Sequence, residues 1–314
     1  MQMNGWKICE SHIFCLILQP EMSTITATIG FFDGVHRGHQ YLIRQVTETA
    51  RREGGKSLIV TMHPHPKAIV QPGHEPRLLT LPDEKMALLH ATGADRVEML
   101  HFSRQMSLLS AQEFMQKVLK EQFHVDTLVM GYEHQFGHGG GTLEQYRAWG
   151  RACGIEVVRA HEMEGEHVSS SVVRHRLEEG DISQANRMLG RRYSMEGTVV
   201  KGHQIGRTLG FPTANIEVPE EKLVPARGVY ATWVVLPGGN RYKGMLNIGR
   251  RPTLDNGEEI TIEVHIMDFQ GDIYRQRLEL QLEERLRAEQ RFGSLEELRS
   301  QLASDALQAR RLLE

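Results

Sequence analysis

Cysteine is scarce in this chain of 314 residues, and no two cysteines have a redox or metal-binding spacing. The three cysteines are Cys9, Cys15 and Cys153, an odd number without a Cys-x-x-Cys string. This pattern argues against a disulfide framework and against a structural zinc site. A reducing, cytoplasmic location is therefore expected.

The chain also lacks an excess of charge of one sign and a long apolar run. Its 37 Lys and Arg against 40 Asp and Glu give a net charge of −3, so no general basic field is present to attract a nucleic-acid backbone. The apolar run 13–18 is much shorter than the ~20 residues of a membrane-spanning helix, and no cleavage site of small residues follows it. We expect small-molecule partners, no nucleic acid, no membrane, and a monomer or weak homo-oligomer.

What is present in the first half is an alternation of strand-like runs with amphipathic segments, which predicts an α/β fold with a parallel sheet covered by helices. Capping boxes are predicted at Ser110 with Glu113 and at Thr80 with Asp83, and Gly93 and Gly154 fall where helices should end. The predicted strands are 24–29, 57–61, 96–100, 127–130 and 155–158.

The second half has a different pattern of predicted elements, and we expect the boundary between two domains near Gly190. Short strands separated by Gly, Pro and Asn turns predict an antiparallel β-barrel, and one helix closes the chain. Ser294 and Glu297 have the spacing of that helix's capping box. The predicted barrel strands are 193–200, 228–236, 242–248, 260–267 and 276–282.

The string GFFDGVHRGH, residues 30–39, is the most informative part of the chain. It follows a strand and opens a helix, where backbone N–H groups and the helix dipole attract anions, and two histidines there favour phosphate. The alternative is that the histidines are surface residues or cap partners. The string predicts a phosphate-handling site.

A second string, GTVVKGHQIGRTLGFPTAN at 197–215, combines four glycines with a hydroxyl and an amide. Glycine loops in barrels are often only turns. Thr213 and Asn215, however, offer the hard oxygen ligands that suit Mg²⁺ bridging nucleotide phosphates. No Gly-x-x-x-x-Gly-Lys-Ser/Thr string is present, so phosphoryl chemistry here does not use a Walker loop.

These strings resemble known signatures. GFFDGVHRGH resembles the HxGH signature of the nucleotidyltransferases, and from about 24 to 310 the chain resembles the bacterial bifunctional riboflavin kinase/FMN adenylyltransferases. The resemblance implies a Rossmann-like adenylyltransferase domain at 22–189, a riboflavin kinase barrel at 190–314, and an extension of uncertain role at 1–21. The further matches are SSSVVR (169–174), GRTLGFPTAN (206–215), NIGRRPT (247–253), EVHIMDF (263–269) and RAEQRFGS (287–294).

For the second half, the resemblance implies phosphorylation of riboflavin to FMN by ATP. Glu263 would act as general base, while Thr213 and Asn215 would hold Mg²⁺. The alternative for Glu263 is a carboxylate on a strand surface in a salt bridge. The implied nucleotide-binding loop contains Gly202, Gly206 and Arg207, and the implied flavin-binding residues are Arg287 and Arg291.

For the first half, the resemblance implies adenylylation of FMN by a second ATP, giving FAD and pyrophosphate. His36 and His39 would stabilise charge on the triphosphate, and Asp33 would orient the turn or the metal. The resemblance also assigns His65 to flavin, and the alternative for His65 is a structural turn. For the string at 169–174, the alternative to phosphate binding is a serine N-cap with a solvated arginine. The other implied nucleotide- or phosphate-binding residues are Gly30, Phe32, Gly38, Ser169, Ser170 and Arg174.

One stretch departs from the family pattern. GYEHQFG, residues 131–137, has Glu133 and His134 where the family has aspartate and phenylalanine, and the glycines 139–141 replace an arginine. This departure leaves open a riboflavin kinase whose adenylyltransferase site has drifted. A flavin-binding regulator without catalysis is the third hypothesis.

Overall fold

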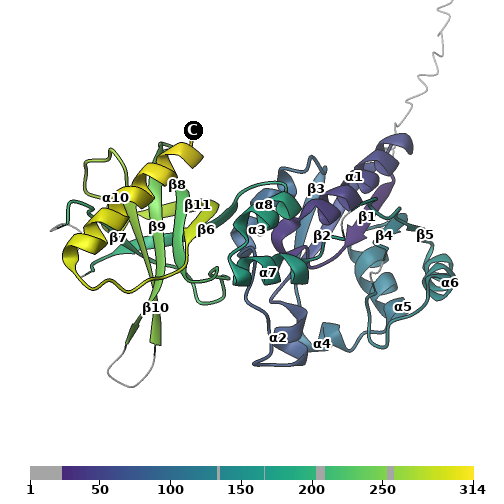
Figure 1. Ribbon diagram of the computed structural model, residues 1–314. Helices are drawn as coiled ribbons and strands as arrows, with labels where there is room; N and C mark the ends of the chain where they lie inside the picture. Colours follow the sequence, from purple (N-terminus) through teal and green to yellow (C-terminus); the bar gives the residue numbers. More distant parts are fainter. Residues whose placement is uncertain (1–22, 133–134, 166, 203–208, 253–257) are drawn as a thin grey trace, which may run out of the picture.

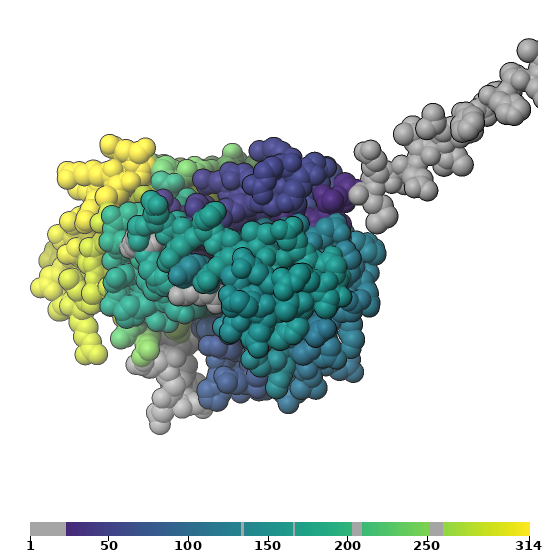
Figure 2. Space-filling model, turned by 90° about the vertical axis from the view of Figure 1, so that its right-hand side faces the viewer, coloured from purple at the N-terminus to yellow at the C-terminus, as the bar shows by residue number. Residues whose placement is uncertain are grey.

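The computed structural model describes residues 23–132, 135–165, 167–202, 209–252 and 258–314. The predictions about residues 1–21, Glu133, His134, Gly206 and Arg207 lie outside the described residues. Figure 1 shows an α/β unit built by the first half of the chain beside a barrel built by the second half, and the two units pack directly against each other (Figure 2). Within the described ranges, no helix is long and apolar enough to cross a membrane.

The α/β unit contains a five-stranded parallel sheet in the order β3-β2-β1-β4-β5. This confirms the predicted fold class. Helices cover both faces, so β2 is buried at its six central residues, as expected for a parallel sheet. The strands are β1 (Ile25–Ile29), β2 (Lys56–His63), β3 (Arg96–His101), β4 (Thr127–Met130) and β5 (Glu156–Arg159).

Alternation along β2 shows how the two faces are covered. Leu58 and Val60 pack in one core with residues of α5, η2 and α6, whereas Ile59 between them packs in another core with residues of α1 and α3. The helical elements before the barrel are η1 (Asp33–Val35), α1 (Arg37–Arg52), α2 (Pro66–Val70), α3 (Pro82–His90), α4 (Arg104–Ser107), α5 (Ala111–Phe114), η2 (Met115–Gln122, π-helical), α6 (Leu143–Cys153), α7 (Ser170–Glu179) and α8 (Ile182–Leu189).

The predicted caps are confirmed in one case and wrong in another. The N–H of Ser110 donates to Glu113 Oε2 at 3.0 Å, and the N–H of Glu113 donates to Ser110 Oγ at 3.2 Å, which is a capping box. The prediction for Thr80 with Asp83 is wrong, because the N–H of Leu81 donates to Glu84 Oε2 at 2.9 Å and the helix starts one residue later. Thr80 is buried and bonds elsewhere.

The second unit is a closed antiparallel barrel, as predicted, and its strand order is β10-β7-β6-β11-β8-β9. The prediction missed β7, which has only four residues. Helix α10 (Leu295–Leu312) packs on β8, β9 and β11. Ser294 Oγ accepts the N–H of Glu297 as expected, but the Glu297 carboxylate accepts the N–H of Gly293, so only half of the predicted capping box is present. The strands are β6 (Tyr193–Val200), β7 (Ala214–Glu217), β8 (Gly228–Val235), β9 (Arg241–Pro252), β10 (Glu258–Ile266) and β11 (Arg277–Arg287).

Candidate functional sites

A cleft of about 510 Å³ opens at the carboxyl ends of β1 and β4, the edge where parallel sheets bind ligands. We call it the sheet-end cleft. Residues that lie far apart in the sequence meet there, because the end of β1, the start of α2 and the start of α7 converge on it. It is lined by all ten candidate residues of the first half, Gly30, Phe32, Asp33, Gly38, His36, His39, His65, Ser169, Ser170 and Arg174.

The turn between β1 and α1 has an unusual backbone. Phe32, Gly34 and Val35 have φ angles of 55°, 77° and 40°, in the left-handed region that favours glycine. Two residues with side chains adopt this conformation next to the cleft, which is typical of backbone strain held at a functional site. A Cβ at Gly34 would also lie 2.8 Å from the side chain of Leu79.

His36 and His39 lie at the start of α1 with their rings stacked, 3.6 Å between centroids. His36 is 4 % exposed, and its Nδ1 accepts the N–H of His39 at 3.3 Å. Burial lowers the pKa of His36 to about 4, although Asp33 opposes the shift. His36 is therefore neutral at pH 7, and because Nδ1 is an acceptor the ring proton is on Nε2, which can donate to a phosphate oxygen.

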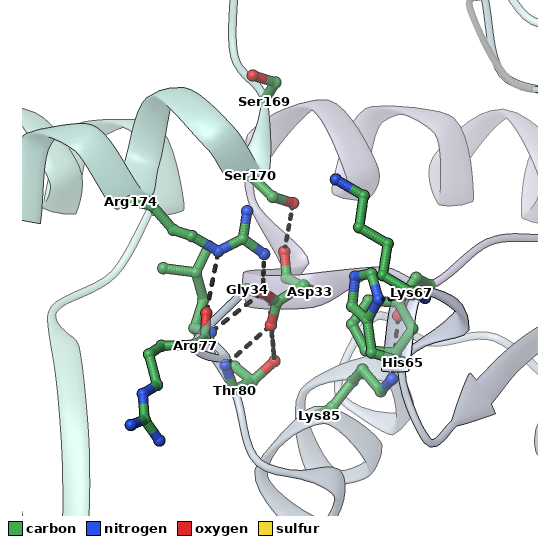
Figure 3. A network of polar contacts seen from close by, with 12 residues as sticks. Asp33, Gly34, His65, Lys67, Arg77, Thr80, Lys85, Ser169, Ser170 and Arg174 are labelled. Atoms are coloured by element: carbon green, nitrogen blue, oxygen red, sulfur yellow. Dashed lines mark hydrogen bonds and ion pairs between the residues drawn. The ribbon is translucent and has the colours of Figure 1, made fainter. Parts of the chain in front are cut away.

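Asp33 is the centre of a polar network that holds this turn (Figure 3). Its carboxylate accepts the N–H of Leu79 at 3.1 Å, the N–H of Thr80 at 3.0 Å and the Thr80 hydroxyl at 3.2 Å. Arg174 pairs with the same carboxylate at 2.5 Å, and Ser170 Oγ donates to the Asp33 carbonyl at 2.9 Å. Since both carboxylate oxygens bind protein donors, the network favours orientation of the turn over a metal-binding role for Asp33.

The start of α7 has a serine N-cap and an arginine, Arg174, whose guanidinium is bound by other residues of the protein. Ser169 Oγ accepts the N–H of Val172 at 3.3 Å, so the serine N-cap exists. Arg174 is not solvated, because its side chain is 13 % exposed and also donates to the Arg77 carbonyl at 3.0 Å. The serine N-cap of the alternative hypothesis for 169–174 is therefore present, but Arg174 lines the cleft and is not solvated.

His65 caps α2 and contacts Phe31, which follows β1. Its Nδ1 accepts the N–H of Lys67 at 3.0 Å, and its ring lies edge-on to Phe31 with 4.2 Å between centroids. Burial is the main cause that lowers the pKa of His65 to about 4. Like His36, His65 is neutral at pH 7.

Four residues that the sequence analysis missed complete this site. Lys85 Nζ donates to the carbonyls of Phe31 at 3.0 Å and of Met62 at 2.9 Å, and Arg191 donates to the Gly34 carbonyl at 2.8 Å. Thr80 binds Asp33, and Lys67 lines the cleft. No local pattern marks Thr80, Lys85 or Arg191, because each binds a residue of the turn at 31–34 that is at least 47 positions away in the sequence.

The two neutral histidines predict a pH-dependent stability. Their folded pKa values lie below the ordinary 6.5, so the unfolded chain binds more protons between pH 4 and 6.5. The stability they contribute is present above pH 6.5 and is lost as the pH falls toward 4. We expect the Tm to fall between pH 7 and pH 5, measured by circular dichroism, and to fall less steeply in His65→Gln. An unchanged slope in that variant would contradict the assignment.

The second candidate site lies on the barrel, where β7 and β10 pair. Glu263 is opposite Asn215 in the register, and Thr213 Oγ1 donates to Glu263 Oε2 at 3.4 Å. Gly202 lies against them, since a Cβ there would be 2.0 Å from Asn215 Nδ2. We call Gly202, Thr213, Asn215 and Glu263 the barrel cluster. The structure brings these four candidates together and adds Asn247, opposite Glu263 on β9.

The barrel cluster offers a hydroxyl, an amide and a carboxylate on neighbouring strands. Such hard oxygen donors fit a Mg²⁺ ion that keeps waters and substrate phosphates as its other ligands. The described residues contain no group of three or more His, Cys, Asp and Glu that could hold a metal ion alone. A cavity of about 420 Å³ begins at Thr213 and is lined mainly by apolar side chains such as Val264 and Phe269.

The two arginines assigned to flavin are placed differently from the barrel cluster. Arg287 forms a buried ion pair with Asp305 of α10 at 2.8 Å, so it ties β11 to that helix. Arg291 is exposed. Within the described part of the chain, no hydrogen bond or ion pair joins either arginine to Glu263, Thr213 or Asn215.

Comparison with known proteins covers both units. The FAD synthetase family model matches residues 18–172, and the riboflavin kinase family model matches residues 189–313. The chain is 37 % identical over 298 residues to the bifunctional riboflavin kinase/FMN adenylyltransferase of Pseudomonas fluorescens, covering 94 % of this chain and 95 % of that one. The proteins of the same name from Escherichia coli K12 and Bacillus subtilis are 36 % and 31 % identical, covering 90 % and 93 % of this chain and 91 % and 94 % of theirs.

A solved structure supports the arrangement of the whole chain. A protein from Streptococcus pneumoniae, described as a macrolide-efflux protein, is 30 % identical and superposes with a TM-score of 0.83. The match covers 92 % of this chain and 94 % of that one, so both units and their arrangement are shared.

Proposed function

Because this chain belongs to the family of bifunctional riboflavin kinase/FMN adenylyltransferases, we propose that its two reactions are divided between the two sites described above. It phosphorylates riboflavin to FMN with ATP and then adenylylates FMN with a second ATP, releasing pyrophosphate. We assign the first reaction to the barrel cluster and the second to the sheet-end cleft. The observation that carries the assignment is the convergence on one cleft of all ten candidates between Gly30 and Arg174.

In the sheet-end cleft, a phosphate oxygen of FMN attacks the α-phosphorus of ATP, and the bond to the β-phosphate oxygen breaks. No protein nucleophile is needed. His36 supplies its Nε2 proton as a hydrogen-bond donor, His39 stands beside it, and the N-terminus of α1 adds backbone N–H groups. The network around Asp33 fixes these groups before the substrates bind, so little reorganisation is required.

In the barrel cluster, Glu263 accepts the proton of the ribityl 5′-hydroxyl while that oxygen attacks the γ-phosphorus of ATP and ADP leaves. Thr213 and Asn215 would hold Mg²⁺. When bound, the ion neutralises charge on the phosphates. Against the alternative that Glu263 is a surface salt-bridge partner, it makes no ion pair with any other residue that the structure describes.

The cleft needs positive charge for two phosphate substrates, and Lys67 supplies it. His36 and His65 are neutral at pH 7, and Arg174 is already paired with Asp33. Lys67 also lines the cleft, is exposed, and forms no ion pair with another described residue. Figure 3 shows its side chain extending beside His65. We assign Lys67 to the binding of substrate phosphate, a charge that offsets the loss of the arginine replaced by the glycines 139–141.

Replacing Lys67 with methionine keeps the length of the side chain and removes its charge. We expect the KM for ATP or FMN in FAD formation to rise about tenfold, which corresponds to ~1.4 kcal/mol of binding, with riboflavin phosphorylation unchanged. Steady-state assays of both reactions measure this. Lys117→Met is the matched control, because Lys117 is exposed and pairs with Glu113 away from the cleft lining. Equal KM values in the two variants would overturn the role of Lys67.

The remaining assignments concern the setting of the enzyme. We propose that it works in the cytoplasm on small molecules only, as a monomer or weak homo-oligomer, with its two domains divided near Gly190. The small net charge and the scarcity of cysteine support this proposal.

A further inference from the structure

A segment of the adenylyltransferase unit, residues 77–80, pairs with a segment of the kinase unit, residues 219–223. The N–H of Leu78 donates to the Glu221 carbonyl at 2.6 Å, and the N–H of Leu223 donates to the Leu78 carbonyl at 2.8 Å. These two bonds form a parallel bridge between Leu78 and Lys222. Arg77 also donates to the Glu220 carbonyl. The two units are thus joined through backbone as well as side chains.

Lys222 is the buried centre of this contact. Its side chain is 1 % exposed, and its Nζ donates to the Leu79 carbonyl at 2.9 Å and pairs with Glu84 Oε2 at 2.5 Å. Burial lowers the pKa of Lys222, and the Glu84 carboxylate opposes that shift. A charge this deeply buried is costly without a partner, so Glu84 on α3 is required for Lys222 to be held there.

The other side of segment 77–80 faces the turn of the sheet-end cleft. Leu79 and Thr80 donate their N–H groups to the two carboxylate oxygens of Asp33. The N–H of Gly34 donates in turn to Thr80 Oγ1 at 3.0 Å. The N–H of Leu79 therefore binds Asp33, and the carbonyl of the same residue accepts from Lys222. Leu79 thus links the contact between the two units to the turn of the sheet-end cleft.

We propose that Lys222, which belongs to the kinase unit, is a positioning residue for adenylyl transfer. It fixes Leu79 and Thr80, these fix Asp33, and Asp33 holds Arg174 and the turn that presents His36. Lys222 lines neither the sheet-end cleft nor the barrel cavity, the two places assigned to substrates. This inference rests on the assignment of adenylyl transfer to the sheet-end cleft.

The test uses the full chain and two variants. Lys222→Met leaves Glu84 buried with no ion partner, whereas Lys222→Met combined with Glu84→Gln removes both charges, and Gln can still accept the N–H of Leu81. We expect kcat for FAD formation from FMN to fall about tenfold or more in both variants, because both lack the bond to the Leu79 carbonyl. Riboflavin phosphorylation is expected to stay at the wild-type rate. The Tm is expected to fall in the single variant and to recover in the double variant.

The recovery of Tm separates positioning from stability. If the double variant regains both its Tm and its FAD formation, Lys222 only stabilises the protein and the inference is wrong. Lys243→Met is the matched control, because Lys243 donates to the Arg310 carbonyl within the kinase unit and should leave FAD formation unchanged. His39→Ala tests the cleft itself, because unchanged FAD formation in that variant would contradict the proposed site. If His39→Ala loses FAD formation but both Lys222 variants keep it at the wild-type rate, only the positioning role of Lys222 is wrong.

Discussion

His39→Ala is expected to lower FAD formation from FMN and ATP by about 10²- to 10³-fold, the cost of removing one preorganised donor to developing charge. The His39 ring stacks on His36 and lies edge-on to Phe32, 5.1 Å between centroids, so two residues of the turn fix its position. Phosphorylation of riboflavin by the same preparation should continue, because no hydrogen bond or ion pair joins the barrel cluster to this turn within the described part of the chain. Separate assays with riboflavin and with FMN as substrate measure the two effects.

Two further variants test whether the effect of His39→Ala comes from the loss of a hydrogen-bond donor in the cleft. His39→Asn should retain more activity than His39→Ala, since an amide can still donate a hydrogen bond to phosphate. His90→Ala is the control, because His90 is exposed at the end of α3 and does not line the cleft. A folded His39→Ala protein that has lost both reactions would show that the two sites are not separate.

Local sequence patterns were sufficient for most of the scaffold. The strands of the parallel sheet, the barrel and the terminal helix follow from alternation and helical spacing, which depend on neighbouring residues only. Strand β7 was missed because Ile216 is its only buried residue, whereas the equally short β4 is buried throughout and forms an apolar run. The cap at Thr80 was mispredicted because its hydroxyl is used by Asp33, a partner 47 positions away that no local rule includes.

The candidate sites divide in the same way. Residues inside the strings at 30–39 and 197–215 could be predicted, because each string is a continuous motif that resembles a known family signature. Lys85, Arg191 and Lys222 could not, because each is an isolated cation whose acceptor is a backbone carbonyl on a distant loop. The flavin assignment of Arg287 stays a prediction, and its motif gave no sign of the ion pair that its guanidinium forms with Asp305.

The kinase unit therefore holds two residues with opposite expected effects on the two reactions. Glu263 belongs to the barrel cluster and should affect phosphorylation alone, whereas Lys222 contacts the adenylyltransferase unit and should affect adenylyl transfer alone. A purely modular enzyme, with each site contained in its own unit, predicts no effect of Lys222 on FAD formation. The bond from Lys222 to the Leu79 carbonyl is the physical reason to expect one.

Glu263→Gln is expected to lower riboflavin phosphorylation by about 10²- to 10⁴-fold, the usual contribution of a general base, because the amide cannot accept the 5′-hydroxyl proton. The substitution keeps the size of the side chain and the acceptor for Thr213 Oγ1, so the pairing of β7 with β10 should persist. FAD formation from supplied FMN should continue at the wild-type rate. Coupled detection of ADP, and chromatography of FMN and FAD, measure the two reactions.

The same variant distinguishes a base from a metal ligand. Mn²⁺ can report on the proposed Mg²⁺ site by electron paramagnetic resonance in the presence of ADP. If Glu263 acts as base, Glu263→Gln should still bind Mn²⁺ with ADP, whereas Asn215→Ala should not. Loss of Mn²⁺ in both variants would make Glu263 a ligand instead, and retention in both would remove Asn215 from the metal site. Because the three oxygen-bearing side chains of the barrel cluster are neighbours on paired strands, only a readout that separates binding from turnover can assign their roles.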